Sequence, residues 1–257
     1  MILTLISPAK KQLAPPVATN IPSRQPRFIA DTAILAKLLA KFDAEGLMSQ
    51  MKISPGLAAL NVERNQKLST PTTAKNSIQA GLMFQGDTYV GLDSSSFSKE
   101  DWSFAEKNLA ILSGLYGLLS PVDLVHPHRL EMGNRLKNPR GETLYAFWKD
   151  VVTNEINRLL EHKENSWVVN LASHEYFKVV LPEEVVGTVI TPIFKDNRGG
   201  KLKVIGIKAK KARGKMARFI IQNRLLEPEP LKNYNEDGYH FQAHLSNNTE
   251  WVFVCDE

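Results

Sequence analysis

Residues 167–178 have the sequence WVVNLASHEYFK, an apolar run that gives way to polar side chains. A short run rich in apolar, β-branched and aromatic residues predicts a buried strand, here over residues 167–172. The chain opens on a comparable pattern, because the apolar run at 2–6 (ILTLI) is followed by SPAK, which puts Lys10 just beyond the predicted strand. In α/β proteins, polar groups beyond the carboxyl ends of strands often line a ligand crevice. These two stretches therefore predict an α/β fold with a site at one edge of its sheet.

The rest of the chain alternates between helical and strand patterns. Helices are expected where apolar residues recur every three or four positions behind a capping residue or a proline. They are expected from Asp31, from Ser54-Pro55, from Ser98 to Gly114, over 143–161 and over 211–226. Further strands are expected over 84–92, 186–194, 202–209 and 251–255. Since no repeat, low-complexity tract or clear linker separates these elements, we predict a single compact α/β domain over residues 1–257, with a mixed sheet flanked by helices.

The composition narrows the class of protein. Among 257 residues, 43% are apolar and 23% are charged, which is a globular composition and excludes wholesale disorder. The one cysteine, Cys255, excludes an internal disulfide framework and a multi-cysteine zinc site, and its apolar surroundings favour burial over redox chemistry. No segment approaches the roughly 18 consecutive apolar residues of a membrane span, and the N-terminus lacks the basic region of a signal peptide. We expect a cytoplasmic protein with no membrane contact and no obligate protein partner.

The positive charge is concentrated in one segment. The chain carries 32 Lys and Arg against 27 Asp and Glu, but residues 195–224 alone hold eleven bases and one acid, Asp196. The first thirty residues add a smaller basic island without any acid. Such segregation favours a polyanionic partner, whereas a solvated basic face without a partner is the plainer alternative.

Within this segment, the predicted helix at 211–226 gathers its charges on one side. Lys211, Lys215 and Arg218 lie on one helical face, and Lys210 and Arg213 lie beside the start of the helix. Positive side chains that converge in this way suit phosphates, either of DNA or of a nucleotide. The chain has no Walker or Rossmann glycine fingerprint that would specify a nucleotide loop.

A second phosphate-binding element is predicted at residues 111–124 (ILSGLYGLLSPVDL). Two glycines three positions apart permit a tight turn, and Ser120 with Asp123 has the spacing of a capping box that would open another helix. A helix–hairpin–helix of this kind presents backbone N–H groups to nucleic-acid phosphates. An ordinary turn between two helices explains the same residues. The turn residues that would contact DNA are Gly114, Leu115, Tyr116 and Gly117.

A third group of candidates consists of polar residues near predicted strand ends, which we expect to line a cleft. The competing interpretation is structural, with Ser173 capping a helix and Arg129 forming an ion pair with Glu131. The candidates are Lys10, Arg129, Glu131, Asn170, Ser173, Glu175 and Lys178.

No metal or cofactor is predicted. The close histidine pairs are His126 with His128 and His240 with His244, and neither has a carboxylate or cysteine companion at a familiar ligand spacing. The adjacency of Ser173 and His174 does not indicate a catalytic triad, because neighbouring side chains usually point apart.

Taken together, several of these motifs resemble the bacterial peroxide stress protein YaaA family, in the same order and over almost the whole chain. The matching segments are ISPAK (6–10), ILSGLYGLLSPVDL (111–124), RLEMG (129–133), LYAFW (144–148), NLASHEYFK (170–178) and AKKARGKMARFII (209–221). The chain departs from the family pattern at Ser120, where the family is expected to have Arg, and at His128, where it is expected to have Tyr. The first change removes one potential phosphate contact, and the second alters a pocket wall or adds a pH-sensitive group.

The resemblance implies a cytosolic α/β protein that is tied to survival of hydrogen peroxide and to lowered free iron. It also implies binding of double-stranded or branched DNA through the helix–hairpin–helix at 114–117 and through the basic strand and helix at 208–218. The family supplies no established reaction, so no catalytic residue is assigned. The rival hypothesis is an enzyme that acts on a small phosphorylated or nucleotide-like substrate. Its cleft would be formed by Lys10, Asn170, Ser173, Glu175, Lys210, Lys211 and Arg213, with the lysines holding phosphate and Glu175 acting on a proton.

Overall fold

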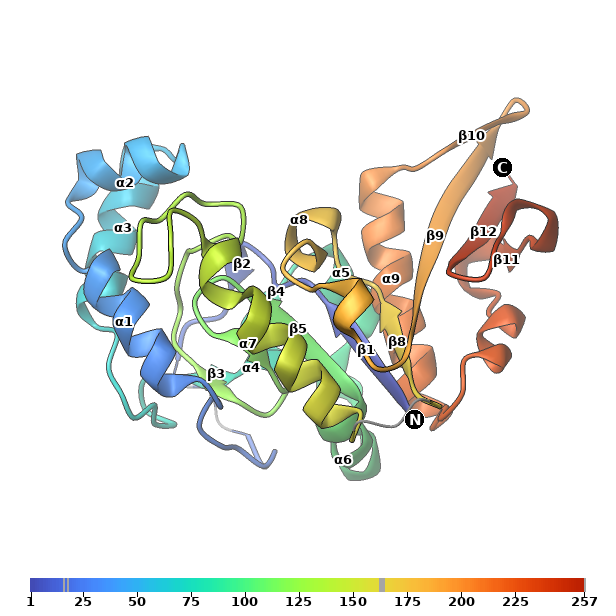
Figure 1. Cartoon of the computed structure of the whole chain (residues 1–257), viewed down its shortest axis with the longest axis horizontal. Coiled ribbons are helices and arrows are strands. Elements are labelled where there is room, and N and C mark those ends of the chain that lie inside the picture. The colour runs from blue at the N-terminus through green and yellow to red at the C-terminus, as the bar shows by residue number, and fades with distance from the viewer. Residues whose placement is uncertain (16, 18, 162–164, 257) are drawn as a thin grey trace.

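A twisted, mostly parallel β-sheet forms the centre of the protein (Figure 1). The computed structural model describes residues 1–15, 17, 19–161 and 165–256. In this part of the chain the main sheet has eight strands, in the order β11-β12-β9-β8-β1-β5-β6, with β10 paired to β9. Its parallel strands are β1 (Ile2–Ile6), β5 (Leu109–Ser113), β8 (Trp167–Asn170), β9 (Thr188–Arg198) and β12 (Glu250–Asp256). Its antiparallel strands are β6 (Gly117–Leu119), β10 (Lys201–Lys203) and β11 (Tyr239–Phe241).

The mixed sheet predicted from the sequence is confirmed. All five residues of β1 are buried between β5 and β8, as their apolar character predicts. β9 instead alternates between buried and less buried positions, because one of its faces is covered less completely. The strand predicted over 202–209 is wrong beyond Lys203, because the chain turns there and α9 (Gly206–Gln222) begins.

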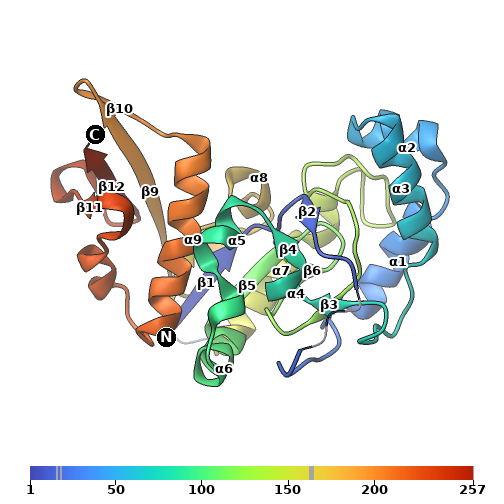
Figure 2. The ribbon, with the colours of Figure 1, turned by 180° about the vertical axis from the view of Figure 1, so that it is seen from behind.

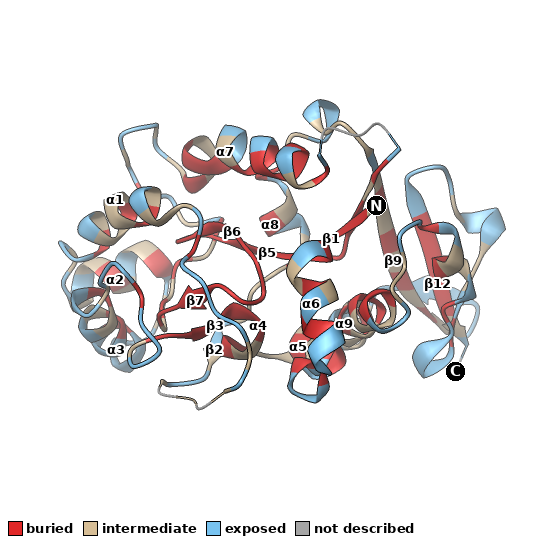
Figure 3. Cartoon of the chain, turned by 90° about the horizontal axis from the view of Figure 1, so that it is seen from below, coloured by how far each residue is buried: buried red, intermediate tan, exposed pale blue. Residues whose placement is uncertain are grey.

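Helices cover both faces of this sheet (Figure 3). The predicted amphipathic helix at 143–161 is confirmed as α7 (Leu144–Leu159), and it buries Phe147 and Trp148 on one face of the sheet. On the opposite face lie α5 (Asp87–Leu92), α6 (Lys99–Asn108) and α9. None of the described helices is long and apolar enough to cross a lipid bilayer.

The predicted helix from Ser98 to Gly114 is half right. Its capping box forms, with the Ser98 hydroxyl accepting a hydrogen bond from the Asp101 backbone N–H at 3.1 Å. However, α6 ends at Asn108 and the chain continues as β5, whose five residues are all buried beside β1. Apolar residues at 109–112 fit a helical face and a buried strand equally well, and pairing with β1 decides for the strand.

The helix–hairpin–helix is therefore wrong, because a β-hairpin occupies its place. Gly114 to Tyr116 join β5 to β6, with Ser113 opposite Gly117 in the ladder. The capping-box residues beyond the hairpin form one turn and no helix: the Asp123 carboxylate accepts from the Ser120 N–H at 2.8 Å, and the Ser120 carbonyl accepts from the Asp123 N–H at 3.1 Å. The same local bonds that open a helix also close an isolated turn.

The predicted strand at 84–92 is also wrong after its first two residues. β4 is limited to Phe84–Gln85, and α5 follows directly. This short helix packs against α9 at unusually close range, since a Cβ atom on Gly214 would lie 1.8 Å from the Thr88 carbonyl oxygen and one on Gly91 would lie 2.2 Å from the Lys211 carbonyl oxygen. Each helix contributes a glycine, so the two backbones touch.

Three helices form the end of the molecule that is farthest from β11 and β12 (Figures 1 and 2). They are α1 (Ile29–Leu39), α2 (Ala44–Met51) and α3 (Pro55–Gln66). The start predicted at Ser54-Pro55 is confirmed, and the helix predicted from Asp31 begins two residues earlier. The remaining short elements are β2 (Lys11–Gln12), β3 (Ile78–Gln79), α4 (Ala80–Met83), β7 (Leu124–Val125), α8 (His174–Phe177) and the 3-10 turns at Ser94–Ser96, Pro182–Glu184, Glu229–Asn233, Glu236–Gly238 and Ala243–Leu245.

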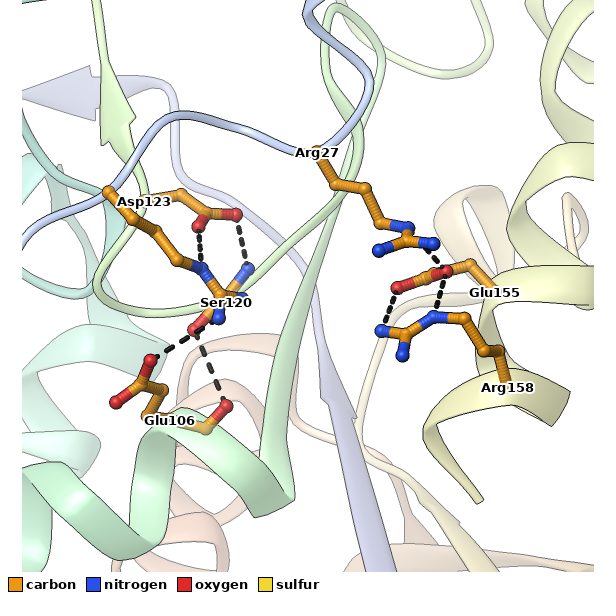
Figure 4. Close-up of polar contacts among 7 residues, drawn as sticks. Arg27, Glu106, Ser120, Asp123, Glu155 and Arg158 are labelled. Atoms are coloured by element: carbon orange, nitrogen blue, oxygen red, sulfur yellow. Dashed lines mark hydrogen bonds and ion pairs between the residues drawn. The ribbon is translucent and has the colours of Figure 1, made fainter. Parts of the chain in front are cut away.

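Ion pairs tie the N-terminal segment to the amino end of the parallel sheet (Figure 4). The Arg24 guanidinium donates to Asp123 at 2.7 Å and lies 3.2 Å from the carboxylate of Glu106 on α6. The backbone adds to this contact, because the Leu124 N–H donates to the Arg24 carbonyl at 2.9 Å. Burial raises the pKa of the Asp123 carboxyl to about 6, although its bonds with Arg24 lower it.

A second set of ion pairs lies beside the first and is centred on Glu155 of α7 (Figure 4). Its buried carboxylate lies between two guanidinium groups, at 2.7 Å from Arg27 and 2.7 Å from Arg158. The space enclosed near these groups is only about 20 Å³. Beside β1 and β5, the amino end of the sheet is therefore tightly packed, and its three arginines face three carboxylates.

Candidate functional site

A cleft lies at the other end of the sheet from these ion pairs, where β1 and β8 end. It has a volume of about 460 Å³. Five stretches of chain form its wall: residues 7–12 after β1, residues 84–88 around β4 and α5, residues 128–131, residues 171–176 after β8, and the first half of α9. A crevice beyond the carboxyl ends of parallel strands is where this class of fold usually binds ligands. The sequence-based expectation of a site at this edge is consistent with the cleft.

Two serines join the strand ends at the floor of the cleft. The Ser173 N–H donates to the Ser7 hydroxyl at 2.9 Å, and that hydroxyl lies 3.3 Å from the Ser173 hydroxyl. The Tyr89 hydroxyl of α5 donates to the Ser7 carbonyl at 3.1 Å. Ser173 stands at the start of α8 but makes no side-chain capping bond, so its hydroxyl serves the contact with Ser7.

Arg129 and Glu131 form the ion pair that the structural interpretation predicted. An Arg129 guanidinium nitrogen lies 3.1 Å from the Glu131 carboxylate, and the Lys10 ammonium lies 3.3 Å from the same oxygen. All three residues line the cleft, so the pair is structural and also forms part of the wall. One carboxylate thus faces two cations, which leaves a surplus of positive charge.

The other predicted cleft residues divide into two groups. Glu175 lines the cleft, and its carboxylate accepts from the Gly133 N–H at 3.1 Å. Asn170 is buried and accepts from the Ala172 N–H at 3.1 Å, and Lys178 lies over the Tyr145 ring at 5.3 Å. The structure therefore brings five of the seven candidates to the cleft and places Asn170 and Lys178 outside its lining. The five are Lys10, Arg129, Glu131, Ser173 and Glu175.

The five basic residues predicted around α9 also divide. Lys210 and Arg213 line the cleft, and Lys211 is half-buried one residue away. Lys215 and Arg218 lie further along the helix and are engaged within the protein. Lys215 contacts Asp237 at 2.5 Å and Glu236 at 3.5 Å. Arg218 contacts the Ser96 hydroxyl at 2.7 Å and the Asp93 carboxylate at 3.1 Å.

Arg213 is the least satisfied charge in the cleft. Among the described residues it has no carboxylate partner; its guanidinium makes a 3.5 Å contact with the Ala172 carbonyl, and its Nε atom is buried without a hydrogen bond. Burial lowers the pKa of Arg213. The Nε atom of Arg129, on another part of the cleft wall, is likewise buried without a partner. Buried donors without partners are rare in native proteins and call for an explanation.

The glycines predicted to contact DNA lie in the core instead of at the cleft. Residues 114 to 117 are all buried. The Gly114 carbonyl accepts from the Trp148 indole at 2.9 Å, and Gly117 has a φ of +72° with the same indole packed on its Cα. The hairpin glycines therefore allow close packing of the turn against α7.

His128 lies in the cleft wall, which is one of the two consequences expected from its departure from the family pattern. Its Nδ1 donates to the His126 carbonyl at 2.8 Å, and burial lowers the pKa of His128 to about 4, so the ring is neutral at physiological pH. His126 is buried and lies 3.2 Å from the Tyr116 hydroxyl. Among the residues that the structure describes, no group of three His, Cys, Asp or Glu side chains is placed to hold a metal ion. Cys255 is half-buried.

Comparison with known proteins places the whole chain in a single family. The family model described as peroxide stress protein YaaA matches residues 2–245. A UPF0246 protein of Colwellia psychrerythraea is 46% identical over 257 residues, which is 100% of both chains. A UPF0246 protein of Aliivibrio fischeri is 45% identical over 257 residues, covering 100% of this chain and 99% of its own. The resemblance seen in the sequence motifs is thus confirmed.

Proposed function

The chain belongs to the peroxide stress protein YaaA family, and from this premise we propose that it binds DNA through backbone phosphates and thereby limits iron-driven peroxide damage. The single observation that carries the proposal is a group of exposed lysines on β10 and near the start of α9. Lys201 and Lys203 of β10 and Lys210 of α9 are exposed, and none of them pairs with a carboxylate in the described part of the chain. The one acid of this basic segment, Asp196, is fully buried and lies 2.6 Å from Lys208.

The shape of the basic surface supports a large ligand. β9 and β10 form a hairpin that projects beyond the rest of the sheet, next to the start of α9 (Figure 1). Its tip is Gly199-Gly200, with φ values of +57° and +79°, the conformation that two-residue hairpins require. A Cβ atom on either glycine would meet nothing within 4 Å, so the tip is open to a partner.

Contacts of this kind are expected to recognise phosphate rather than base sequence. Lysine side chains neutralise phosphates and release the cations condensed around DNA. Ferrous iron held near the backbone would be released with them, so the proposal connects DNA binding to protection from peroxide without requiring an iron site in the protein. Base readout is expected to be small, because phosphates carry no sequence information.

A salt titration tests this proposal. We expect the affinity for duplex DNA to fall with salt and to be similar for unrelated sequences. Replacing Lys201, Lys203 and Lys210 together with Gln should reduce the slope of log K against log salt by about 2.7, or about 0.9 for each lost contact. The matched control is Lys215→Gln with Arg218→Gln, which removes charges from the same helix that are already engaged within the protein. An unchanged slope in the triple variant, with the fold intact by circular dichroism, would show that the lysines are only a solvated surface.

A second candidate function is an enzyme that acts on a small phosphorylated or nucleotide-like substrate. One observation favours it: Ser173 and Glu175 of α8 and Lys210 of α9 line the same cleft of about 460 Å³, a typical size for small-molecule sites. A thermal-shift screen of nucleotides separates the two candidates, because an enzyme of this kind should be stabilised by a small ligand even where duplex DNA has no effect.

A further inference from the structure

We propose that the cleft binds a terminal phosphate monoester, the 5′-phosphate of a nucleotide, with Arg213 as its main anchor. The inference rests on the proposed DNA binding and gives it a preference for strand ends. The first argument is charge. The cleft lining holds five cationic side chains and three carboxylates, which is an excess of two positive charges. A phosphate monoester carries about −1.5 to −2 at neutral pH, whereas an internal phosphodiester carries −1.

The second argument is the pair of unsatisfied guanidinium groups. The Nε atoms of Arg129 and Arg213 are buried without a hydrogen bond, and both residues line the cleft. Arg129 is balanced by Glu131, but Arg213 has no such partner among the described residues. A guanidinium presents a planar fork of donors that matches phosphate oxygens. A phosphate at Arg213 would supply the acceptors that the protein itself does not.

The third argument is that Arg213 is held in position before any ligand arrives. Gly214, the next residue of α9, packs directly on the α5 backbone, which fixes the rotation of the helix beside the cleft. The hydroxyls of Ser7 and Ser173 lie on the cleft floor, and Lys210 stands one helical turn before Arg213. The anchor thus has further phosphate donors close by, contributed by three separate elements.

The fourth argument concerns why the cleft should bind the terminal phosphate of a DNA strand and not the backbone of a continuous strand. Asp87, Glu131 and Glu175 are interspersed among the cations of the lining. A backbone running through the cleft would bring successive phosphates against these carboxylates, whereas a single terminal phosphate can bind at Arg213 and Lys210, one helical turn apart on α9. The cleft volume of about 460 Å³ also suits one nucleotide better than a duplex.

The decisive experiment compares two DNA duplexes that differ only in their ends. Fluorescence anisotropy at fixed salt should show binding of a 5′-phosphorylated duplex about tenfold tighter than of the same duplex with 5′-hydroxyl ends. Arg213→Gln should abolish that difference while retaining the affinity for the hydroxyl-ended duplex. Its thermal midpoint should be unchanged or higher, because the variant removes a half-buried charge that has no carboxylate partner among the described residues. Lys215→Gln, on the same helix but away from the cleft, should retain the preference.

Free nucleotides distinguish the source of the phosphate. A deoxynucleoside 5′-monophosphate should compete with the phosphorylated duplex and stabilise the protein in a thermal-shift assay. Arg213→Lys keeps the positive charge but loses the planar set of guanidinium donors, so it should weaken both the competition and the stabilisation. Binding of the free nucleotide without any end preference on DNA supports the cleft site with a free nucleotide as its ligand. Equal affinity for both duplexes, together with no response to the mononucleotide, overturns the inference. The DNA-binding proposal would survive that result if the salt dependence assigned to Lys201, Lys203 and Lys210 were observed.

Discussion

The two ends of the parallel sheet use the same residue types in opposite ways. At the amino end, Arg24 and Arg27 reach buried carboxylates at 2.7 Å, and the space between the groups is about 20 Å³. At the carboxyl end, Arg213 is half-buried beside a cleft of about 460 Å³, with a buried Nε atom and no carboxylate partner among the described residues. Matched charges hold chain segments together, whereas an unmatched, partly buried charge costs stability, which is why we propose a ligand at Arg213.

Helix α9 shows the same contrast within one element. Its first half carries Lys210 and Arg213 at the cleft, and its second half carries Lys215 and Arg218 in internal contacts. The sequence spacing correctly predicted a helix with basic residues along it. It could not distinguish the basic residues that pair with groups inside the protein from those that remain available to a partner.

The largest expected effect on stability concerns the packing of α5 on α9, beside the cleft at the carboxyl end of the sheet. Gly214→Ala should lower the free energy of unfolding by about 4 kcal/mol, because the added Cβ would lie 1.8 Å from the Thr88 carbonyl and would force α5 and α9 apart. Gly206→Ala on the same helix is the matched control and should be neutral or slightly stabilising, since nothing lies within 4 Å of that position. Urea denaturation measures both. Similar stabilities for the two variants would contradict the close packing of α5 on α9.

The next test disrupts the amino end. Glu155→Gln should destabilise the protein by about 2–3 kcal/mol, because it leaves Arg27 and Arg158 without their shared carboxylate; their half-exposure keeps the cost below that of a fully buried pair. DNA affinity should not change. A variant as stable as the parent in urea would mean that the matched charges at this end contribute little.

A pH titration tests the buried carboxyl beside Arg24. The pKa of Asp123, about 6, lies above its usual value near 3.9, so the folded state binds this proton more tightly than the unfolded state does. The resulting stabilisation is fully present below about pH 4 and is lost as the pH rises through about 6. Relative to Asp123→Asn, which cannot titrate, the parent should therefore gain on the order of 2 kcal/mol between pH 7 and pH 4. A pH-independent difference between the two proteins would argue that Arg24 keeps the carboxyl ionised throughout.

The smallest expected effect concerns affinity at the cleft. Glu131→Gln raises the charge excess of the lining from two to three while leaving an oxygen for Lys10 and Arg129. Binding of a deoxynucleoside 5′-monophosphate should tighten several-fold, or by about 1 kcal/mol. Isothermal titration calorimetry gives the comparison, and weaker binding would indicate that Glu131 contacts the ligand directly.

Local sequence signals correctly predicted the helices and strands whose hydrophobic pattern fits only one type of secondary structure or whose capping residues lie a few positions apart. The apolar run of β1, the amphipathic pattern of α7 and the Ser98 capping box all specify their structure within a few residues. The segment at 109–113 was misjudged because its apolar residues satisfy both periodicities, and the choice depends on β1, about a hundred residues away.

The candidate site was likewise predicted only in part, because local sequence signals identify some of its residues and long-range contacts determine the others. Polar residues after a strand were found because the strand ends identify them, but Ser7 and the α5 segment were missed. Contact between Gly91 and Gly214 joins residues far apart in the chain, and nothing in either local sequence specifies that distance. The one available signal was a glycine inside the α9 pattern, which often marks a close backbone approach when it is retained in a helix.

Strand β9 gives the molecule a mechanical property. Its eleven residues extend on the order of 35 Å, with the base paired to β8, the middle to β12 and the tip to β10. A load applied at the Gly199-Gly200 tip is therefore carried along one continuous strand and borne by backbone hydrogen bonds in shear, beside the strand that leads to Ser173.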